Sequence, residues 1–207
     1  MDTTGKERMT AMKQMSYMFA SDLHGSALYT RRLLDAFGES GADMLILLGD
    51  LLYHGPRNPL PEGYDPAAVA ALLNPLADRI LAVRGNCDAE VDQMMLEFPM
   101  MADYALLPVE GCKLFLTHGH LYNTDRPPRL SRNDVLLHGH THVPACLHQP
   151  AGWWYLNPGS VTLPKEESPR GYMLLEEGVF IWKTLEGRTY KTFPLHEGSA
   201  TSARSLF

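Results

Sequence analysis

"DVLLHGHTHVP", Asp134 to Pro144, places three histidines at alternate positions directly after a short apolar run. Six of the nine histidines of the chain fall between His118 and His148. A histidine-rich tract is compatible with a metal tether, a solvated loop or part of a catalytic centre. The segments around the tract decide between these alternatives.

Five other segments share its construction, in which an apolar run is followed at once by a polar residue. They are "YMFASDLHG" (17–25), "MLILLGD" (44–50), "RILAVRGN" (79–86), "KLFLTHGH" (113–120) and "WYLNPGS" (154–160). Short continuous apolar runs bounded by glycine or aspartate are typical of strands that are buried on both faces. The sequence therefore predicts a sheet whose strands end in polar, metal-binding side chains.

Two helices are expected between the first three of these strands. Residues 26–40 carry apolar side chains at helical spacing, with Ser26 as the N-cap. A second helix is predicted over "PAAVAALLNPLADR" (66–79), bent or split at Pro75. Strand, helix, strand, helix, strand is the pattern of right-handed crossovers onto a mixed sheet.

The C-terminal part has closely spaced apolar runs instead. "GYMLLEE" (171–177) and "GVFIWKTLEG" (178–187) indicate two strands with a hairpin turn at Glu177-Gly178. We expect these late strands to supply a second sheet packed on the first. The Pro-rich stretches 55–66 and 126–133 are predicted surface loops, and the first is expected to overhang the site.

Length and composition favour one globular domain. The 207 residues are 45% hydrophobic and 20% charged, which fits a single globular domain over 16–195. We predict a disordered extension at 1–15 and a disordered tail at 196–207. No apolar run approaches the roughly 20 residues that cross a bilayer, and the N-terminus lacks a signal-peptide core. These features predict no membrane partner and a cytoplasmic location.

Charge and cysteine content narrow the class further. The net charge of -6 argues against an extended nucleic-acid-binding face, which needs clustered lysine and arginine. It is compatible with a small anionic substrate if a bound metal reverses the local field. Cys87, Cys112 and Cys146 are an odd, scattered set without CxxC spacing, which suits a reducing compartment.

Polar residues that follow five different strands are expected to meet. Ligands bind beyond the carboxyl ends of parallel strands, where these ends lie side by side. The candidate metal ligands are Asp22, His24, Asp50, Asn86, His118, His140 and His142. In "DLH" and "HTH" the outer residues point to the same side if the backbone is extended. Nitrogen and oxygen donors without sulfur favour manganese, iron or zinc in a working site.

Seven ligands suit two ions that share a bridging carboxylate. Two-metal sites clamp both the attacking and the leaving oxygen of an in-line displacement. Two carboxylates against two divalent cations leave the centre positive, so that it attracts a phosphate anion. The neutral Asn86, where a third carboxylate could be, keeps the metals more Lewis-acidic.

The order of these motifs resembles the calcineurin-like metallophosphoesterases. The motifs are "DLH" (22–24), "GD" (49–50), "GN" (85–86), "THGH" (117–120) and "GHTH" (139–142). "FASDLHGS", "HGPRNPLPEGY", "VRGNCD" and "NPGSV" are closer still to the YfcE-type bacterial phosphodiesterases within that family. Each motif alone is weak, but all five in order form a specific signal over Met18 to about Leu175.

The resemblance implies an α/β fold, a four-layer α/β/β/α metallophosphoesterase sandwich with two mixed sheets. It also implies a dinuclear centre of two divalent ions, usually Mn²⁺, with Zn²⁺, Fe or Ni²⁺ as alternatives. Metal one would be held by Asp22, His24, Asp50 and His142, and metal two by Asp50, Asn86, His118 and His140. The implied reaction is hydrolysis of phosphodiester bonds in a small substrate by a metal-bridging hydroxide. Asp50, Asn86 and His118 are then also catalytic candidates.

One position departs from the wider family. Most members have a histidine after the Gly-Asn, placed to protonate the leaving group, whereas this chain has Cys87. A thiol is a weaker hydrogen-bond partner than imidazolium. We therefore hypothesise that leaving groups of low basicity, or those assisted by the second metal, are favoured. An inert packing role is the alternative for Cys87.

Weaker candidates complete the set. His120 is a further catalytic or supporting candidate, and His54 and Arg57 are candidates for substrate phosphate, with a solvated loop as the alternative. The Met-rich "DQMMLEFPMMADY" (92–104) predicts adaptable core or surface, with a homo-oligomer interface as the alternative. Two other functions stay open: a phosphomonoesterase, and a non-catalytic protein-interaction scaffold on the same fold.

Overall fold

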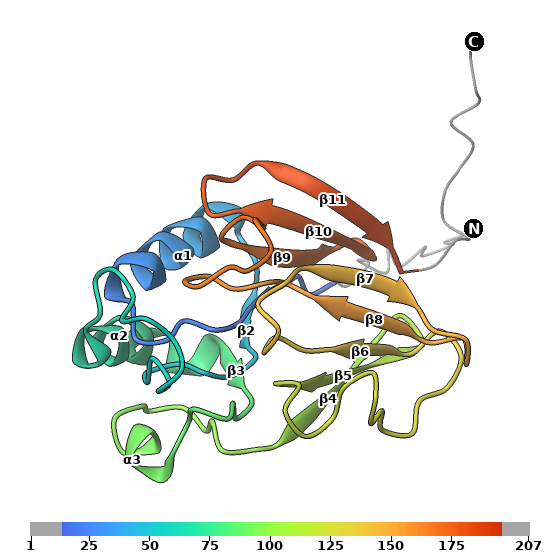
Figure 1. Cartoon of the computed structure of the whole chain (residues 1–207). Helices are drawn as coiled ribbons and strands as arrows, with labels where there is room; N and C mark the ends of the chain where they lie inside the picture. The colour runs from blue at the N-terminus through green and yellow to red at the C-terminus, as the bar shows by residue number, and fades with distance from the viewer. Residues whose placement is uncertain (1–13, 196–207) are drawn as a thin grey trace, which may run out of the picture.

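Two mixed β-sheets face each other in the structure, a computed structural model that describes residues 14–195 (Figure 1). The first sheet has six strands in the order β11-β10-β9-β1-β2-β3. The second has five, in the order β4-β5-β6-β8-β7. The expected pair of mixed sheets is confirmed.

The first sheet begins with the predicted crossovers. Strands β1 (Tyr17–Ala20), β2 (Met44–Leu47) and β3 (Ile80–Ala82) pair in parallel. Helix α1 (Ala27–Ser40) connects the first two, and Ser26 caps it by accepting a hydrogen bond from the backbone N–H of Tyr29. The second connection is split as predicted at Pro75, into α2 (Pro66–Leu73) and the 3₁₀ helix η1 (Asn74–Arg79). The ring of a proline cannot continue the α-helical hydrogen bonding.

The prediction for the late strands was wrong. Strands β9 (Gly171–Glu176), β10 (Val179–Thr184) and β11 (Thr189–Pro194) extend the first sheet, because β9 pairs antiparallel with β1. The predicted hairpin turn does join β9 to β10, with both Glu177 and Gly178 at positive φ. Periodicity identifies strands but does not say which distant strand each of them will pair with.

The second sheet is built from the middle of the chain. It contains β4 (Tyr104–Val109), β5 (Cys112–Thr117), β6 (Val135–Leu137), β7 (Ala145–His148) and β8 (Trp154–Asn157). Strands β5, β6 and β8 are parallel, and β4 and β7 are antiparallel edges. The carboxyl ends of β5 and β6, which carry the histidine motifs, therefore lie at one end of this sheet.

A shared core joins the two sheets. Phe19 and Ile46 of the first sheet pack with Leu116 and Leu137 of the second, and Trp182 is fully buried among them. Full burial of each large apolar side chain contributes about 1.5–3 kcal/mol. Because the inner faces of both sheets pack into one core, the two sheets are fixed relative to each other. The ends of their strands are therefore fixed as well.

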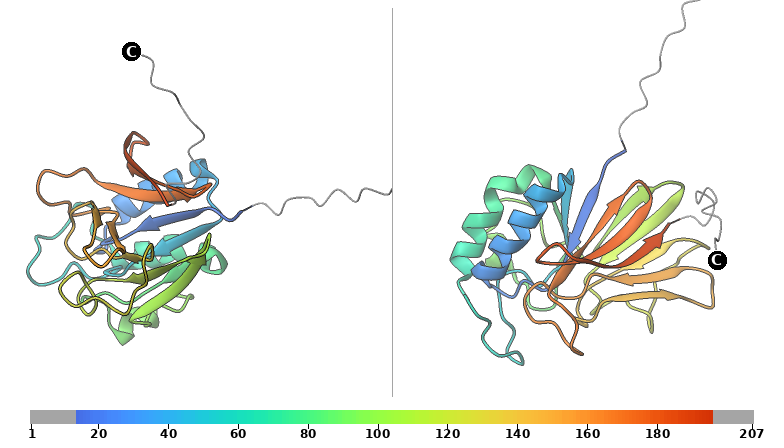
Figure 2. Two further views of the ribbon diagram at one scale, coloured as in Figure 1. Left: turned by 90° about the vertical axis from the view of Figure 1, so that its right-hand side faces the viewer. Right: turned by 90° about the horizontal axis from the view of Figure 1, so that it is seen from above.

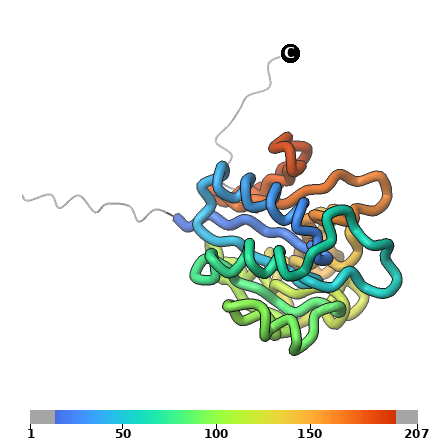
Figure 3. Tube along the Cα trace, turned by 90° about the vertical axis from the view of Figure 1, so that its left-hand side faces the viewer, coloured from blue at the N-terminus to red at the C-terminus, as the bar shows by residue number. Residues whose placement is uncertain are grey.

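Helices cover the outer face of the first sheet. Helices α1 and α2 lie together on that side (Figure 2) and run next to each other (Figure 3). On the outer face of the second sheet, Phe115 and Leu136 are covered by Tyr122 and Leu130 of an irregular loop. The short α3 (Glu90–Gln93) precedes that sheet, and the expected fold of two mixed sheets with few helices is confirmed.

The domain limits stay a prediction. The expected disorder at 1–15 and 196–207 falls, apart from Gln14 and Met15, outside the described residues. The Met-rich stretch is divided between two environments, with Met94 84% exposed and Met100 fully buried. None of the helices within residues 14–195 has the length and apolar character of a membrane span.

Candidate metal centre

The seven predicted ligands follow five strands that come from both sheets. Asp22 and His24 follow β1, Asp50 follows β2 and Asn86 follows β3. The histidines follow β5 and β6 of the second sheet. The site therefore lies where the ends of the two sheets meet, whereas the sequence suggested one row of strand ends.

The backbone at the ligands is not extended, contrary to the alternation that we expected. The left-handed region is adopted by five of the ligands, namely Asp22, His24, Asp50, His140 and His142, with φ between 47° and 65°. Residues other than glycine rarely occupy this region, and each costs of order 1–3 kcal/mol. Each turn bends the chain sharply at the strand end, so that the side chain points into the centre. Such strain is concentrated at functional sites.

The glycines of the motifs allow backbones to approach the ligands. A Cβ on Gly139 would lie 1.9 Å from Oγ of Ser21 and 2.6 Å from Oδ2 of Asp22. A Cβ on Gly85 would lie 2.1 Å from Oδ1 of Asp50. The Gly-His and Gly-Asn pairs therefore have a steric cause, because no side chain fits between these loops.

One group of ligand atoms surrounds Asp22. Nε2 of His142 lies 3.3 Å from Oδ1 of Asp22, and Nε2 of His24 lies 3.7 Å from the same oxygen. The two Nε2 atoms are 3.2 Å apart. Oδ1 of Asp22 is buried and accepts no hydrogen bond from any described residue. These three residues form one of the groups able to hold a metal ion.

A second group surrounds His118. Its Nε2 lies 3.1 Å from Oδ1 of Asn86, 3.1 Å from Nδ1 of His140 and 3.4 Å from Oδ2 of Asp50. The same Oδ2 of Asp50 lies 3.8 Å from Nε2 of His24. Asp50 thus lies between the two groups, as a bridging carboxylate must.

Backbone carbonyls orient the imidazoles. Nδ1 of His24, His118 and His142 lies against the carbonyl oxygens of Tyr53, Leu48 and Leu163, respectively. Donation of Nδ1–H to these carbonyls leaves the Nε2 lone pairs directed into the centre, as in metal-ligating histidines. Lone pairs and carboxylate oxygens then face each other, which is favourable only when a cation lies between them.

The spacings fit metal ligation. Two ligand atoms about 2.1 Å from one ion lie about 3.0 Å apart at right angles and about 3.4 Å apart in a tetrahedron. The separations within the two groups are 3.1–3.7 Å. The residues present therefore fit two cations with nitrogen and oxygen ligands.

The carboxylates draw positive charge onto the centre. Burial alone would lower the pKa of His118, but contact with Asp50 raises it to about 9. Burial and the neighbouring His118 lower the pKa of His140 to about 4. The pKa of Asp50 is lowered despite its burial, because His118 hydrogen-bonds to it. The shifts of His118 and Asp50 favour an ion pair between these two side chains, whereas the lowered pKa of His140 favours its neutral form.

Asp88 is a supporting residue that sequence reasoning missed. It is 8% exposed, and its carboxylate accepts backbone hydrogen bonds from Asp50, Leu51 and Gly85 at 2.7–2.8 Å. Burial raises its pKa to about 6, against the effect of these donors. Asp88 joins the loops that carry Asp50 and Asn86. In the sequence, the only indication of this supporting role was that Asp88 directly follows "GNC".

The segment 157–162 joins the remaining ligand loops, and its contacts were also missed. The Asn157 side chain donates hydrogen bonds to the carbonyl of Gly139 at 2.9 Å and accepts one from the backbone N–H of Gly159 at 2.7 Å. Ser160 Oγ donates to the carbonyl of Asp22 at 3.0 Å. The Asn-Pro-Gly turn was visible in the sequence, but its long-range partners were not.

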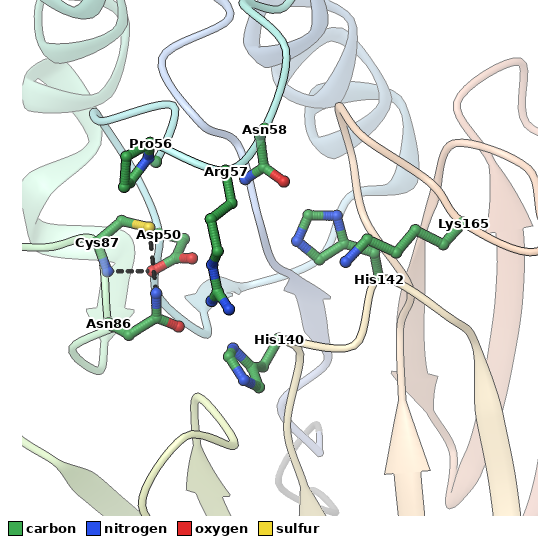
Figure 4. Close-up of a pocket in the computed structure, with 10 residues that line it drawn as sticks. Asp50, Pro56, Arg57, Asn58, Asn86, Cys87, His140, His142 and Lys165 are labelled. Carbon is green, nitrogen blue, oxygen red and sulfur yellow. Dashed lines mark hydrogen bonds between the residues drawn. The ribbon is translucent and has the colours of Figure 1, made fainter.

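A cavity of about 410 Å³ opens onto the centre (Figure 4). It is lined by Asp50, Asn86, His140 and His142, by Cys87 and Lys165, and by residues 55–58. The predicted overhanging loop thus borders the site. Lys165, from the loop after β8, is a lining residue that the sequence did not indicate.

The weaker candidates have different surroundings. Cys87 and Arg57 line the cavity, and burial together with Asp50 raises the pKa of the Cys87 thiol. The ring of His120 is 5.4 Å from that of His118, and His54 packs between two tyrosine rings. Neither His120 nor His54 is among the residues that line the cavity. Their roles stay predictions.

This combination of two mixed sheets and a histidine-rich acidic centre is that of a metallophosphoesterase. The family model for the calcineurin-like phosphoesterase superfamily domain matches residues 15–178, and the chain belongs to this family. The resemblance predicted from the motifs is confirmed.

Individual relatives refine the position within the family. Phosphodiesterase YfcE of Escherichia coli K12 is 52% identical over 165 residues, which cover 80% of this chain and 89% of YfcE. The solved structure of YfcE matches with a TM-score of 0.84 and 47% identity, over 88% of this chain and 100% of that one. The probable metallophosphoesterase YsnB of Bacillus subtilis is 30% identical over 78% of this chain and 83% of YsnB.

Proposed function

We propose that this protein is a metal-dependent phosphodiesterase, a phosphoric diester hydrolase that acts on small substrates through a dinuclear centre. The observation that carries the proposal is the pair of facing imidazole groups on either side of Asp50, each with acceptor atoms turned inward. The 52% identity to a protein named as a phosphodiesterase supports the diester as substrate.

The two groups of atoms suggest how the ligands divide. Metal one would be held by Asp22, His24, Asp50 and His142, and metal two by Asp50, Asn86, His118 and His140. The first group contains the 3.2 Å contact of His24 with His142, and the second the 3.1 Å contact of His118 with His140. Manganese is the metal that we propose, with zinc, iron or nickel as alternatives that availability decides.

Two divalent cations held there would lower the pKa of a bound water to supply a hydroxide, and would neutralise charge on the phosphate oxygens. The chain itself orients the phosphate. Arg57 extends from the overhanging loop into the cavity, towards the side where Asn86 and His140 lie (Figure 4). We propose that its guanidinium binds a non-bridging oxygen of the scissile phosphate, for which its planar donors are suited.

The position of Cys87 supports the hypothesis on leaving groups. A thiol buried beside the carboxylate of Asp50 donates a proton less readily than a histidine would. We expect Cys87→His to accelerate diesters with alkoxide leaving groups more than diesters with nitrophenolate leaving groups. If the ratio of the two rates is unchanged, the thiol does not limit the choice of leaving group.

A single assay tests the function. Hydrolysis of bis-p-nitrophenyl phosphate is compared with that of p-nitrophenyl phosphate, with Mn²⁺ and with EDTA. Activity on the diester that chelation abolishes supports the proposal, and preference for the monoester would make the protein a phosphomonoesterase. No turnover with any divalent metal would favour a scaffold role.

Two further expectations belong to this proposal. The cysteines Cys87, Cys112 and Cys146 are unpaired, which supports a reducing, cytoplasmic environment. A homo-oligomer stays a prediction that rests on the exposed methionines 94 and 95.

A further inference from the structure

Two cationic side chains at the cavity have no partner within the described part of the chain. Arg57 and Lys165 line the cavity, and neither side chain makes an ion pair or a hydrogen bond with any of residues 14–195. Lys113, by contrast, has a carboxylate nearby and forms an ion pair with it, with Nζ 3.2 Å from Oδ2 of Asp134. Unpaired cations beside an anion-binding centre indicate that the substrate supplies the counter-charge.

Lys165 is held by a tight turn. Ser168 donates two hydrogen bonds to the carbonyl of Lys165, from its backbone N–H at 3.0 Å and from Oγ at 2.6 Å. Glu166 and Glu167, at the centre of the turn, have φ of 52° and 56°, a conformation that glutamate rarely adopts. The backbone N–H of Lys165 donates to the carbonyl of His142 at 3.2 Å. The turn thus fixes Lys165 relative to a proposed metal ligand.

Arg57 belongs to a comparable turn on another loop. The backbone N–H of Asn58 donates to the carbonyl of Gly55 at 3.2 Å, and the Asn58 side chain donates to the carbonyl of His54 at 2.9 Å. In Figure 4 the side chain of Arg57 lies over the centre and that of Lys165 lies beside His142. Two separate hydrogen-bonded turns therefore present one cation each to the same cavity.

A simple phosphodiester carries one negative charge, which the metals and Arg57 would already neutralise. A second phosphate next to the scissile one would bring the additional charge that matches Lys165. We propose that Lys165 is a specificity-determining residue that binds this second phosphate, so that the preferred substrates are diphosphate-linked diesters. The inference rests on the proposed phosphodiesterase function and extends it to the phosphoanhydride bond that joins the two phosphates of such a substrate.

The reaction on such a substrate is a hydrolysis. The oxygen of water forms a bond to one phosphorus, and the bond from that phosphorus to the bridging oxygen breaks. The electron pair leaves with the bridging oxygen on the second phosphate, and the protons of water pass to the products and the solvent. The products are two phosphomonoesters, and no redox partner is needed.

The test compares two substrates on the Mn²⁺-loaded full chain. Diadenosine 5′,5′-diphosphate, whose hydrolysis yields two AMP, is set against bis-p-nitrophenyl phosphate, which has no second anion. We expect Lys165→Ala to raise KM for the diphosphate about tenfold more than KM for bis-p-nitrophenyl phosphate. Lys165→Arg should restore most of this difference. Lys113→Ala removes the same charge from the opposite end of β5 and should change the KM ratio less than twofold.

Binding without turnover gives an independent measurement. Titration calorimetry with methylenediphosphonate and methylphosphonate should show the diphosphonate losing about tenfold more affinity than the monophosphonate in Lys165→Ala. Equal losses for both ligands, or equal KM changes for both substrates, would overturn the assignment while leaving the phosphodiesterase function intact. Wild-type protein that hydrolyses neither substrate would instead remove the proposed function, and this inference with it.

Discussion

Replacement of Asn157 tests whether one buried amide holds the histidine loop in place. Asn157 is fully buried, and its side-chain amide donates to the carbonyl of Gly139, to Oγ1 of Thr141 and to the hydroxyl of Tyr155 at 2.9–3.0 Å. Its Oδ1 accepts from the backbone N–H of Gly159 at 2.7 Å. Alanine at this position would remove these contacts, most of which are buried.

The magnitude follows from the partners that are left behind. Loss of an ordinary hydrogen bond costs about 1 kcal/mol, and a buried group without any partner costs about 1–3 kcal/mol. The N–H of Gly159 would be left without an acceptor among the described residues, whereas the carbonyl of Gly139 would keep the hydrogen bond from the N–H of Thr141 at 2.7 Å. We therefore expect Asn157→Ala to lower the free energy of unfolding by about 3–5 kcal/mol. Because Gly139 precedes His140, the affinity for Mn²⁺ should fall as well.

Urea unfolding monitored by circular dichroism, together with calorimetric Mn²⁺ titration, measures both effects. Asn74→Ala is the control, since the Asn74 side chain also bonds to backbone groups, donating to the carbonyl of Met95 and accepting from the N–H of Glu97, but at a partly exposed position away from the ligand loops. Water can replace those bonds, so we expect a loss of about 1 kcal/mol and unchanged Mn²⁺ affinity. If Asn157→Ala costs no more than the control and binds Mn²⁺ normally, the amide does not position the loop.

Three further predictions follow from the same structure. Gly139→Ala should destabilise the fold by about 2–4 kcal/mol and weaken Mn²⁺ binding, because its Cβ would overlap Oγ of Ser21 at 1.9 Å. The control Gly38→Ala in α1, with no atom within 4 Å of its Cβ, should stabilise the protein by about 0.5–1 kcal/mol, and urea unfolding of both variants decides the point. Burial alone would raise the pKa of Asp134, but the pKa is lowered. The backbone N–H groups of Ser131 and Lys113 donate to its carboxylate, and the ammonium group of Lys113 stabilises the negative charge. A folded pKa below the unfolded value of about 3.9 gives stability that is present above about pH 4 and is lost as the pH falls through the folded pKa. Asp134→Asn should therefore lose less stability than wild type between pH 5 and pH 3, and equal losses would contradict this account. Finally, Mn²⁺ at about 100 times its Kd should add about 2.7 kcal/mol per site and raise the Tm by about 5–10 °C, with EDTA reversing the change. A Tm that is insensitive to Mn²⁺, Zn²⁺ and EDTA would speak against a metal centre.

The sequence predicts the candidate ligands from local features alone. Each of the ligands directly follows an apolar run, and the end of a buried strand is set by the few residues around it. The Ser26 cap and the split at Pro75 are also local and appear where they were expected. The destination of the late strands was predicted wrongly, because the pairing of β9 with β1 joins residues more than 150 positions apart.

Several functional details have no local signal at all. The left-handed backbone of Asp22 and His140 accompanies a contact between distant loops, in which the backbone N–H of His140 donates to Oδ2 of Asp22. Asp88 and Lys165 are single charged residues, and a lone charge in a sequence indicates a solvated surface as readily as a buried support or a substrate contact. Only their distances to Asp50 and His142 separate these possibilities.

By itself, the sequence determined which side chains can ligate metal, which segments form buried strands and to which family the motifs point, because these depend on residue type and short-range periodicity. The tertiary structure decided which sheet each strand joins, how the seven candidate ligands lie relative to Asp50, and which residues outside the motifs contact the loops that carry them. These features depend on contacts between distant parts of the chain. Such contacts form because they lower the free energy of the whole packed core. That free energy cannot be read from any single segment of the sequence.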